Sequence, residues 1–189
     1  SDVCSSDLNR LSDAAACVRQ GGVIAYPTEF CFGLGCDPTN EHAVRRILAL
    51  KQRRWQQGLI VIADHHERLR HLVDMSDPDL MAGPLASWPG PHSWLLPAKN
   101  SVAAWVRGQH SSVAVRVSAH PVVRALCKEC GTALISTSAN RTGRPPLRSA
   151  HAVANEFGDA IDCIVDASVG GASEPSTITD AATGRSLRG

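Results

Sequence analysis

Hydrophobic residues follow two different periods along the chain, and this pattern predicts interleaved helices and strands. Apolar residues recur at helical spacing from Asn9 to the glycine pair at 21–22, and short apolar runs of strand length separate the later helical segments. Helices are predicted at residues 9–20, 40–54, 65–73, 78–88, 102–107, 121–130 and 149–157. Strands are predicted at residues 23–26, 59–63, 94–97, 113–117, 133–137, 161–165, 176–179 and 186–188.

This order of elements favours a single α/β domain. Neither an internal repeat nor a low-complexity linker interrupts it. We therefore expect residues 9–189 to form one domain, built on a twisted, mostly buried sheet flanked by helices. The first eight residues do not fit this pattern, because the peptide DVCSSDL resembles a translated sequencing adapter, and we expect residues 1–8 to be a non-native segment.

The composition is typical of a compact soluble domain. The chain has 189 residues, of which 43% are apolar and 20% charged, and no apolar run approaches the roughly 18 residues of a membrane span. Nineteen basic against eighteen acidic residues give a formal charge of +1, so any anion site must be local. The seven cysteines, an odd number without a secretory signal, favour reduced thiols and a cytoplasmic protein.

Two common site signatures fail on their spacing. The Gly33-Leu34-Gly35 triplet is followed by Cys-Asp-Pro, so neither the dinucleotide fingerprint nor the P-loop is present. Cys127 and Cys130 form one CxxC pair, but no second ligand pair follows at zinc spacing. We interpret them as two thiols near a helix end, and no metal site is predicted.

Several short segments carry unusual polar chemistry. Arg116 lies in a predicted strand of alternating valines, where it shares a face with Ala114 and needs an anionic partner from the protein or a ligand. Lys51 and Arg53 lie at the C-terminal end of a predicted helix. Cations at this position interact favourably with the helix dipole, which would explain them without a ligand. The STSAN run at 136–140 follows an apolar strand, a position that suits ligand binding and helix capping equally well. The stretch 28–37 is predicted to be a loop whose two glycines allow a close backbone approach.

Taken together, these segments resemble the YrdC-like family of L-threonylcarbamoyladenylate synthases. The resemblance runs from about Leu11 to Arg188 and includes the opening VIAYPTEFCFGLGCDP at 23–38. The family's KxR…SxN signature appears as Lys51, Arg53, Ser138 and Asn140. Its other motifs occur in the expected order along the chain, with WPGP at 88–91, AVRV at 114–117 and PSTI at 175–178. The chain looks like the short, single-domain bacterial form of the family.

The resemblance implies an enzyme that makes threonylcarbamoyl-AMP and pyrophosphate from L-threonine, bicarbonate and ATP. It also implies Mg²⁺, bound with ATP rather than in a tight protein site. The product would donate the N6-threonylcarbamoyl group to adenosine 37 of tRNA, through a downstream threonylcarbamoyl-transferase complex. The fold implied is a curved α/β sheet with a concave, electropositive cavity.

The resemblance also implies roles for particular residues. The catalytic group, which is also expected to bind ATP, is Lys51, Arg53, Ser138 and Asn140. Three further residues are expected to contact ATP, with Arg188 near the nucleotide: Ser112, Pro146 and Arg188. Four residues are expected at the threonine site, with Arg116 on the threonine carboxylate: Thr28, Arg116, Ser136 and Ser176. No protein nucleophile is implied, and positioning with charge neutralisation would carry the reaction.

Two other functions are consistent with parts of the sequence. A YrdC-like module that binds RNA without synthase activity would use the arginines at 141, 144 and 148 that follow the SxN motif. The net charge of +1 and the small number of aromatic residues weigh against this function. A carbamoyltransferase of the hydrogenase-maturation type would need additional modules, for which this chain has no room.

Overall fold

The computed structural model describes the backbone of residues 5–188 and the side chains of residues 10–188. The helices are α1 (Ser5–Arg19), α2 (Glu41–Lys51), α3 (Pro78–Ser87), α4 (Ala104–Arg107), α5 (Pro121–Cys130) and α6 (Ala150–Phe157), with short 3₁₀ turns at Trp55–Gln57, His66–Leu69 and Gly158–Ala160. The strands are β1 (Ile24–Pro27), β2 (Phe32–Gly35), β3 (Ile60–Ala63), β4 (His92–Pro97), β5 (Ser112–Val117), β6 (Leu134–Ser138), β7 (Cys163–Ile164), β8 (Thr177–Asp180) and β9 (Ser186–Arg188).

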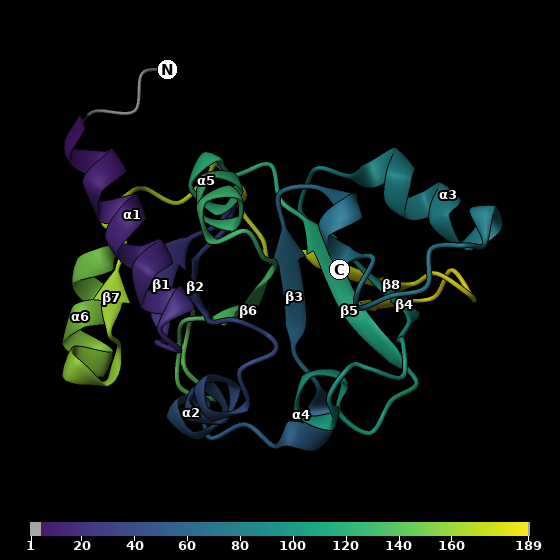
Figure 1. Cartoon of the computed structure of the whole chain (residues 1–189), viewed down its shortest axis with the longest axis horizontal. Coiled ribbons are helices and arrows are strands. Elements are labelled where there is room, and N and C mark those ends of the chain that lie inside the picture. The colour runs from purple at the N-terminus through teal and green to yellow at the C-terminus, as the bar shows by residue number, and fades with distance from the viewer. Residues whose placement is uncertain (1–4, 189) are drawn as a thin grey trace.

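All these strands belong to one mixed sheet. Their order is β7-β1-β2-β6-β3-β5-β4-β8-β9. The pairs β1–β7, β3–β5 and β4–β8 are parallel and the other neighbours are antiparallel. Figure 1 shows the sheet twisting strongly from β1 to β4, with helices on both sides. This arrangement confirms the predicted single α/β domain. Within residues 5–188, no helix has the length and apolar character needed to cross a membrane.

Helices cover the two faces of the sheet unequally. On one face, α1 and α5 pack over β1, β3 and β6 through a compact apolar cluster that includes Tyr26, Ile62 and Leu134. On the other face, α2, α3, α4 and α6 contribute to a larger cluster that contains Val113 and Val115 of β5. The larger cluster therefore closes its face, whereas α1 and α5 cover only part of theirs.

The uncovered part of the first face is polar because of strand alternation. Ile62 lies beside Leu134 on one neighbouring strand and beside Arg116 on the other, and residues two apart along a strand share a face. Ser136, which follows Leu134 on the same face, pairs with Ile60. The same sheet face thus changes from apolar under α1 and α5 to serine and arginine beyond them.

The segment predicted as a loop at 28–37 contains a strand instead. β2 pairs with β1 on one side and β6 on the other, so the loop prediction is wrong for Phe32–Gly35. Glycine is a poor strand former, which hides the strand from sequence patterns. The predicted close approach is confirmed at Gly35, where a Cβ atom would lie 2.5 Å from the Ile135 carbonyl oxygen and 2.6 Å from Tyr26 Cε1.

Other differences concern the lengths of elements. The helix predicted at 65–73 is only the turn His66–Leu69, because Val73 leaves it to form a β-bridge with Ala98. The strand predicted at 161–165 shrinks to β7, and the helix at 102–107 to α4. The first helix begins at Ser5 rather than Asn9. Residues 1–4 of the segment interpreted as non-native lie outside the described residues, and this interpretation stays a prediction.

Candidate functional site

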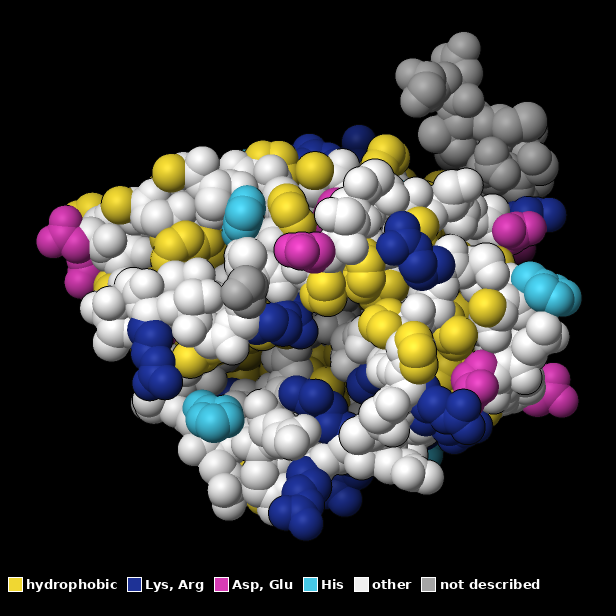
Figure 2. Space-filling model, turned by 180° about the vertical axis from the view of Figure 1, so that it is seen from behind, with side chains coloured by type: hydrophobic (Ala, Val, Ile, Leu, Met, Phe, Trp, Pro, Cys, Tyr) yellow, Lys and Arg dark blue, Asp and Glu magenta, His cyan; other side chains and the backbone are white. Residues whose placement is uncertain are grey.

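One cavity collects all the residues that were predicted as catalytic or substrate-binding. It has a volume of about 590 Å³ and opens on the uncovered part of the sheet face. Figure 2 shows this hollow near the middle of the molecule, with basic side chains along it. The eleven predicted site residues all line it: Thr28, Lys51, Arg53, Ser112, Arg116, Ser136, Ser138, Asn140, Pro146, Ser176 and Arg188.

The lining is positively charged. Five lysine and arginine residues line the cavity, namely Lys51, Arg53, Arg107, Arg116 and Arg188. Among residues 10–188, whose side chains are described, no aspartate or glutamate lines it. A cavity with this charge and partial burial favours anionic ligands, because desolvation strengthens each electrostatic contact.

Lys51 reaches the cavity as the last residue on the buried face of α2. The helix begins at Asn40, whose side chain accepts a hydrogen bond from the Ala43 backbone N–H. Its buried face then continues through Val44, Ile47 and Leu48, and Lys51 occupies the next position of the same stripe. Burial of this lysine, which is 4% exposed, is therefore a consequence of helical periodicity.

The KxR and SxN motifs meet at one end of the cavity. Lys51 Nζ donates to the backbone oxygens of Ser138 at 2.6 Å and Asn140 at 3.1 Å, and to Asn140 Oδ1 at 2.9 Å. Ser138 Oγ donates to the same Asn140 Oδ1 at 2.6 Å. Arg53 donates through Nε and Nη2 to the Gly58 carbonyl oxygen at 3.2 and 3.0 Å. All these acceptors are neutral, so the two cations keep their full charge for a ligand.

Burial without a carboxylate changes the acidity of these cations. Desolvation, with a smaller contribution from the charge of Arg53, lowers the pKa of Lys51 to about 8. Desolvation also lowers the pKa of Arg53. An incoming anion would reverse both effects by favouring the charged forms. This end of the cavity, defined by Lys51, Arg53, Ser138 and Asn140, is called the KxR/SxN end below.

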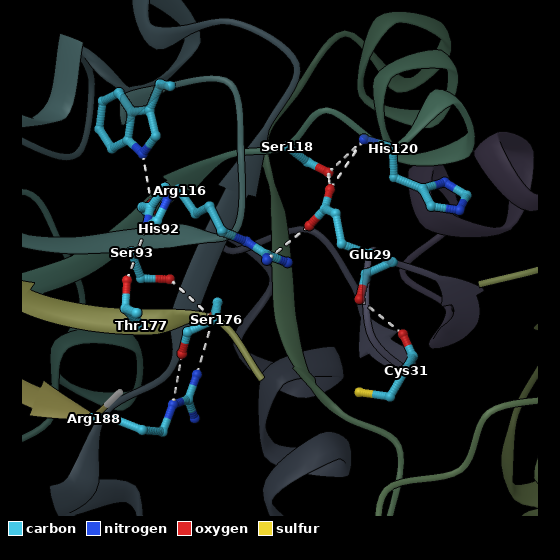
Figure 3. A network of polar contacts seen from close by, with 12 residues as sticks. Glu29, Cys31, His92, Ser93, Arg116, Ser118, His120, Ser176, Thr177 and Arg188 are labelled. Carbon is cyan, nitrogen blue, oxygen red and sulfur yellow. Dashed lines mark hydrogen bonds and ion pairs between the residues drawn. The ribbon is translucent and has the colours of Figure 1, made fainter. Parts of the chain in front are cut away.

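A second group of lining residues consists of Thr28, Arg116, Ser176 and Arg188, and its part of the cavity is called the Arg116 end. Thr28 Oγ1 donates to the Cys31 carbonyl oxygen at 2.8 Å, at the turn between β1 and β2. Arg116 projects from β5 toward Glu29, with 2.8 Å between Nη1 and Oε2 (Figure 3). The strand alternation that directs Arg116 away from the valine face is as predicted.

Arg188 is hydrogen-bonded to Ser176, a residue of the Arg116 end. It donates through Nε to the Ser176 carbonyl oxygen and through Nη2 to Ser176 Oγ, both at 2.9 Å. Desolvation and the nearby charges of Arg116 and, to a smaller extent, Arg53 lower its pKa. Arg188 was expected near the nucleotide, but its hydrogen bonds are to a residue expected at the threonine site.

The other predicted residues occupy the floor and rim of the cavity. Ser136 is a buried residue of β6, and Ser112 starts β5 opposite Pro97. Pro146 lies in the segment between β6 and α6. Beside this segment, the Arg148 guanidinium stacks over the Phe30 ring at 4.9 Å.

The sequence motifs gave no role to Glu29, Arg107 or His110. Arg107 and His110 line the cavity, and Arg107 Nη1 donates to the His110 carbonyl oxygen at 2.8 Å. Glu29 follows Thr28 directly, and Arg116 needed an anionic partner. These two facts together were the available signal, but only the fold shows that the partner is Glu29.

The CxxC pair does not line the cavity. Cys127 and Cys130 are free thiols near the end of α5, and Cys127 Sγ faces the Ile62 carbonyl oxygen at 3.8 Å. Burial raises the pKa of Cys130 to about 11, so this thiol stays protonated at neutral pH. Within the described residues, no three His, Cys, Asp or Glu side chains are grouped to hold a metal ion.

A cavity lined by five cations, and by no carboxylate among the side chains described, favours anionic ligands. A family model described as "Sua5_yciO_yrdC: Telomere recombination" matches residues 16–188. The chain therefore belongs to the Sua5/YciO/YrdC family.

Relatives of similar length carry one name. The chain is 50% identical over 188 residues to the threonylcarbamoyl-AMP synthase of Marinobacter nauticus, covering 99% of each chain. It is 48% identical over 171 residues to the synthase of Methylobacillus flagellatus, covering 90% of this chain and 94% of that one.

A solved structure supports the same family and fold. The crystal structure of P. abyssi Sua5 complexed with L-threonine matches with a TM-score of 0.84 and 33% identity over 90% of this chain. This chain spans half the length of that protein, 50%.

Proposed function

We propose that this protein is a threonylcarbamoyl-AMP synthase whose two substrates occupy opposite ends of the cavity. The enzyme joins L-threonine, bicarbonate and ATP to form threonylcarbamoyl-AMP and pyrophosphate. The observation that carries the proposal is the meeting of Lys51, Ser138 and Asn140 at one end of a cationic cavity, in a chain that relatives with this name match along nearly their whole length.

ATP binds at the KxR/SxN end. Lys51 and Arg53 hold the triphosphate, because one is a buried and the other a partly buried cation whose hydrogen bonds go to neutral oxygens. Ser138 and Asn140 lie beside the α-phosphate and the nucleotide. Ser112 and Pro146 contribute to the same subsite from the floor and rim. Preorganised cations of this kind stabilise the charge that develops during phosphoryl or nucleotidyl transfer.

L-Threonine binds at the Arg116 end, together with Thr28, Ser136 and Ser176. A guanidinium matches a carboxylate as a two-pronged donor, so Arg116 takes the carboxylate of the amino acid. Arg188 is hydrogen-bonded to Ser176 and lies next to this subsite. The two ends face one cavity, so a carbamate formed on the threonine amine meets the α-phosphorus without leaving the site.

The chemistry demands this arrangement of charge. The carbamate and the triphosphate are both anions. In a partly dry cavity, each charge without a counter-charge costs on the order of several kcal/mol, as for any buried ion. The cations of the lining offset this cost. The reaction needs no protein nucleophile, since the carbamate oxygen attacks the α-phosphorus directly and pyrophosphate leaves.

Mg²⁺ enters this reaction as part of the ATP complex. Magnesium sites in proteins usually use one or two carboxylates plus substrate phosphates. Among the described side chains the lining offers hydroxyl and amide oxygens but no carboxylate, so these residues do not by themselves form a magnesium site. We assign no step to a protein-held metal.

The product is the activated donor for N6-threonylcarbamoyladenosine at position 37 of tRNA, through the transferase complex that follows. We expect the enzyme in the cytoplasm, where ATP and tRNA are available. A pure RNA-binding function is disfavoured because the cations gather inside a cavity of small-molecule size.

The test is pyrophosphate release from ATP with magnesium and bicarbonate, with and without L-threonine. We expect threonine-dependent release by the wild type and loss of it in Lys51→Ala and Ser138→Ala. Lys128→Ala and Ser173→Ala are matched controls, since both residues are exposed and outside the lining. Folded wild type that binds ATP but releases no pyrophosphate overturns the proposal, and tRNA binding that falls steeply with salt would then favour the RNA-binding function.

A further inference from the structure

Glu29 and Arg116 form a buried ion pair at the Arg116 end of the cavity. Their side chains are 13% and 7% exposed and point toward each other from the loop after β1 and from β5 (Figure 3). Three strands separate β1 from β5 in the sheet. In a flat sheet the two strands would lie about 19 Å apart, so the pair exists only because the sheet curls and the loop folds over its concave face.

Glu29 is held in place at its Oε1 atom and at its backbone oxygen. Its Oε1 accepts hydrogen bonds from Ser118 Oγ and from the His120 backbone N–H, the latter at 3.0 Å. Its backbone oxygen accepts from the Ala172 N–H at 3.1 Å. A Cβ atom at Gly170 would lie 2.9 Å from Glu29 Cα, so the loop that leads to Ser176 packs directly on this residue. Glu29 therefore lies where the segments that carry Thr28, Arg116 and Ser176 meet.

The pairing singles out Arg116 among the cations of the cavity. Of the side chains described, Glu29 is the only carboxylate in an ion pair with a lining cation. The pair uses Arg116 Nη1, whereas Arg116 Nε is buried and has no hydrogen-bond partner within residues 10–188. Glu29 Oε2 is likewise buried without a hydrogen-bond partner among the residues described, so the ion pair is the contact that holds the two side chains together. Because Arg116 also lines the cavity, a ligand carboxylate can bind the guanidinium from the cavity side.

We propose that Glu29 is a positioning residue for the amino-acid substrate, which it serves by holding the Arg116 guanidinium in place at the cavity lining for the threonine carboxylate. This inference rests on the proposed function. The ion pair at Nη1 restricts the guanidinium, so that its remaining donors stay at the cavity. The negative charge of Glu29 also offsets that of Arg116, so the ammonium group of an incoming zwitterion is not repelled.

The experiment compares Glu29→Gln with wild type by steady-state kinetics of threonine-dependent pyrophosphate release. Glutamine keeps the shape of the side chain and the acceptor for Ser118 and His120 but removes the charge that orients Arg116. We expect the KM for threonine to rise about 10-fold to 100-fold, with kcat at saturating threonine and the KM for ATP changed less than about threefold. Glu29→Asp, which restores the charge, should recover part of the threonine affinity.

Two further variants keep the outcome decisive. Glu174→Gln, at an exposed position close to Ser176, is the matched control and should behave as wild type. If Glu29→Gln does not fold, Ser118→Ala replaces it, with an expected rise of about threefold in the KM for threonine alone. An unchanged threonine KM, or equal changes in both KM values, overturns the positioning role. Absence of threonine-dependent release in folded wild type would instead overturn the proposed function.

Discussion

The two ends of the cavity handle positive charge in opposite ways. At the KxR/SxN end, Lys51 and Arg53 are buried against carbonyl, hydroxyl and amide oxygens, and their pKa values are lowered. At the Arg116 end, Arg116 has its own carboxylate in Glu29. The first end is left with net charge that only a polyanion can compensate. At the second end one of the two arginines is already compensated, so less net charge is left there, which suits a zwitterionic amino acid.

The largest expected effect comes from breaking the compensated end. Arg116→Met leaves Glu29 buried without its partner, and we expect a loss of about 3–5 kcal/mol in the free energy of unfolding. The double variant Glu29→Gln/Arg116→Met should recover most of this loss. Urea unfolding measures both. If Lys51→Met, which removes a cation with no carboxylate partner, costs as much stability as Arg116→Met, the contrast between the two ends is wrong.

Breaking the uncompensated end should affect catalysis more than folding. We expect Lys51→Ala to lower kcat/KM for ATP by about 100-fold to 1000-fold, because a preorganised cation at the phosphates is lost. Steady-state pyrophosphate release is the measurement, with Lys128→Ala as the control. A decrease below about tenfold would mean that Lys51 does not contact the phosphates.

Arg188 tests where the boundary between the ends lies. Its hydrogen bonds to Ser176 predict that Arg188→Ala raises the KM for threonine by about tenfold, with a smaller change in the KM for ATP. The measurement is the KM for threonine and the KM for ATP, both determined on one protein preparation. The reverse order of effects would assign Arg188 to the nucleotide, as the family resemblance implied.

The pH dependence of nucleotide binding gives the smallest and most specific effect. The pKa of Lys51 is lowered to about 8, so below that pH the ammonium is present and binds phosphate, whereas above it the neutral amine does not. Affinity for an ATP analogue should fall up to about tenfold per pH unit above pH 8. Lys51→Arg, whose guanidinium stays charged, should remove this dependence. A wild-type affinity that is flat up to about pH 9 would contradict it.

Much of the fold and site could be predicted from the sequence, for identifiable reasons. The apolar stripes of α2 and α5 and the valines of β5 follow standard periods, so these elements appear where expected. β2 was missed because its glycines, required by close packing on Tyr26 and β6, carry no strand signal. The helix predicted at 65–73 failed because a tertiary contact, the bridge from Val73 to Ala98, replaces its last turns.

The site residues were predictable as a set because their motifs resemble a known family. Their division into two ends was harder to predict from the sequence. The pairing of Glu29 with Arg116 depends on sheet curvature between strands that are not neighbours, which no local pattern encodes. The hydrogen bonds from Arg188 to Ser176 depend on the register of β8 with β9, which includes an irregularity between Ile178 and Thr179.

The central claim is that the two ends of the cavity bind different substrates, and one calorimetric experiment tests it most directly. An unreactive ATP analogue and L-threonine are each titrated into folded wild type, Lys51→Ala and Arg116→Lys. We predict that Lys51→Ala loses affinity for the nucleotide and keeps it for threonine, whereas Arg116→Lys, which retains a charge for Glu29 but not the two-pronged donor, does the opposite. Loss of both ligands in both variants, or loss of threonine binding in Lys51→Ala alone, would contradict the division of the cavity.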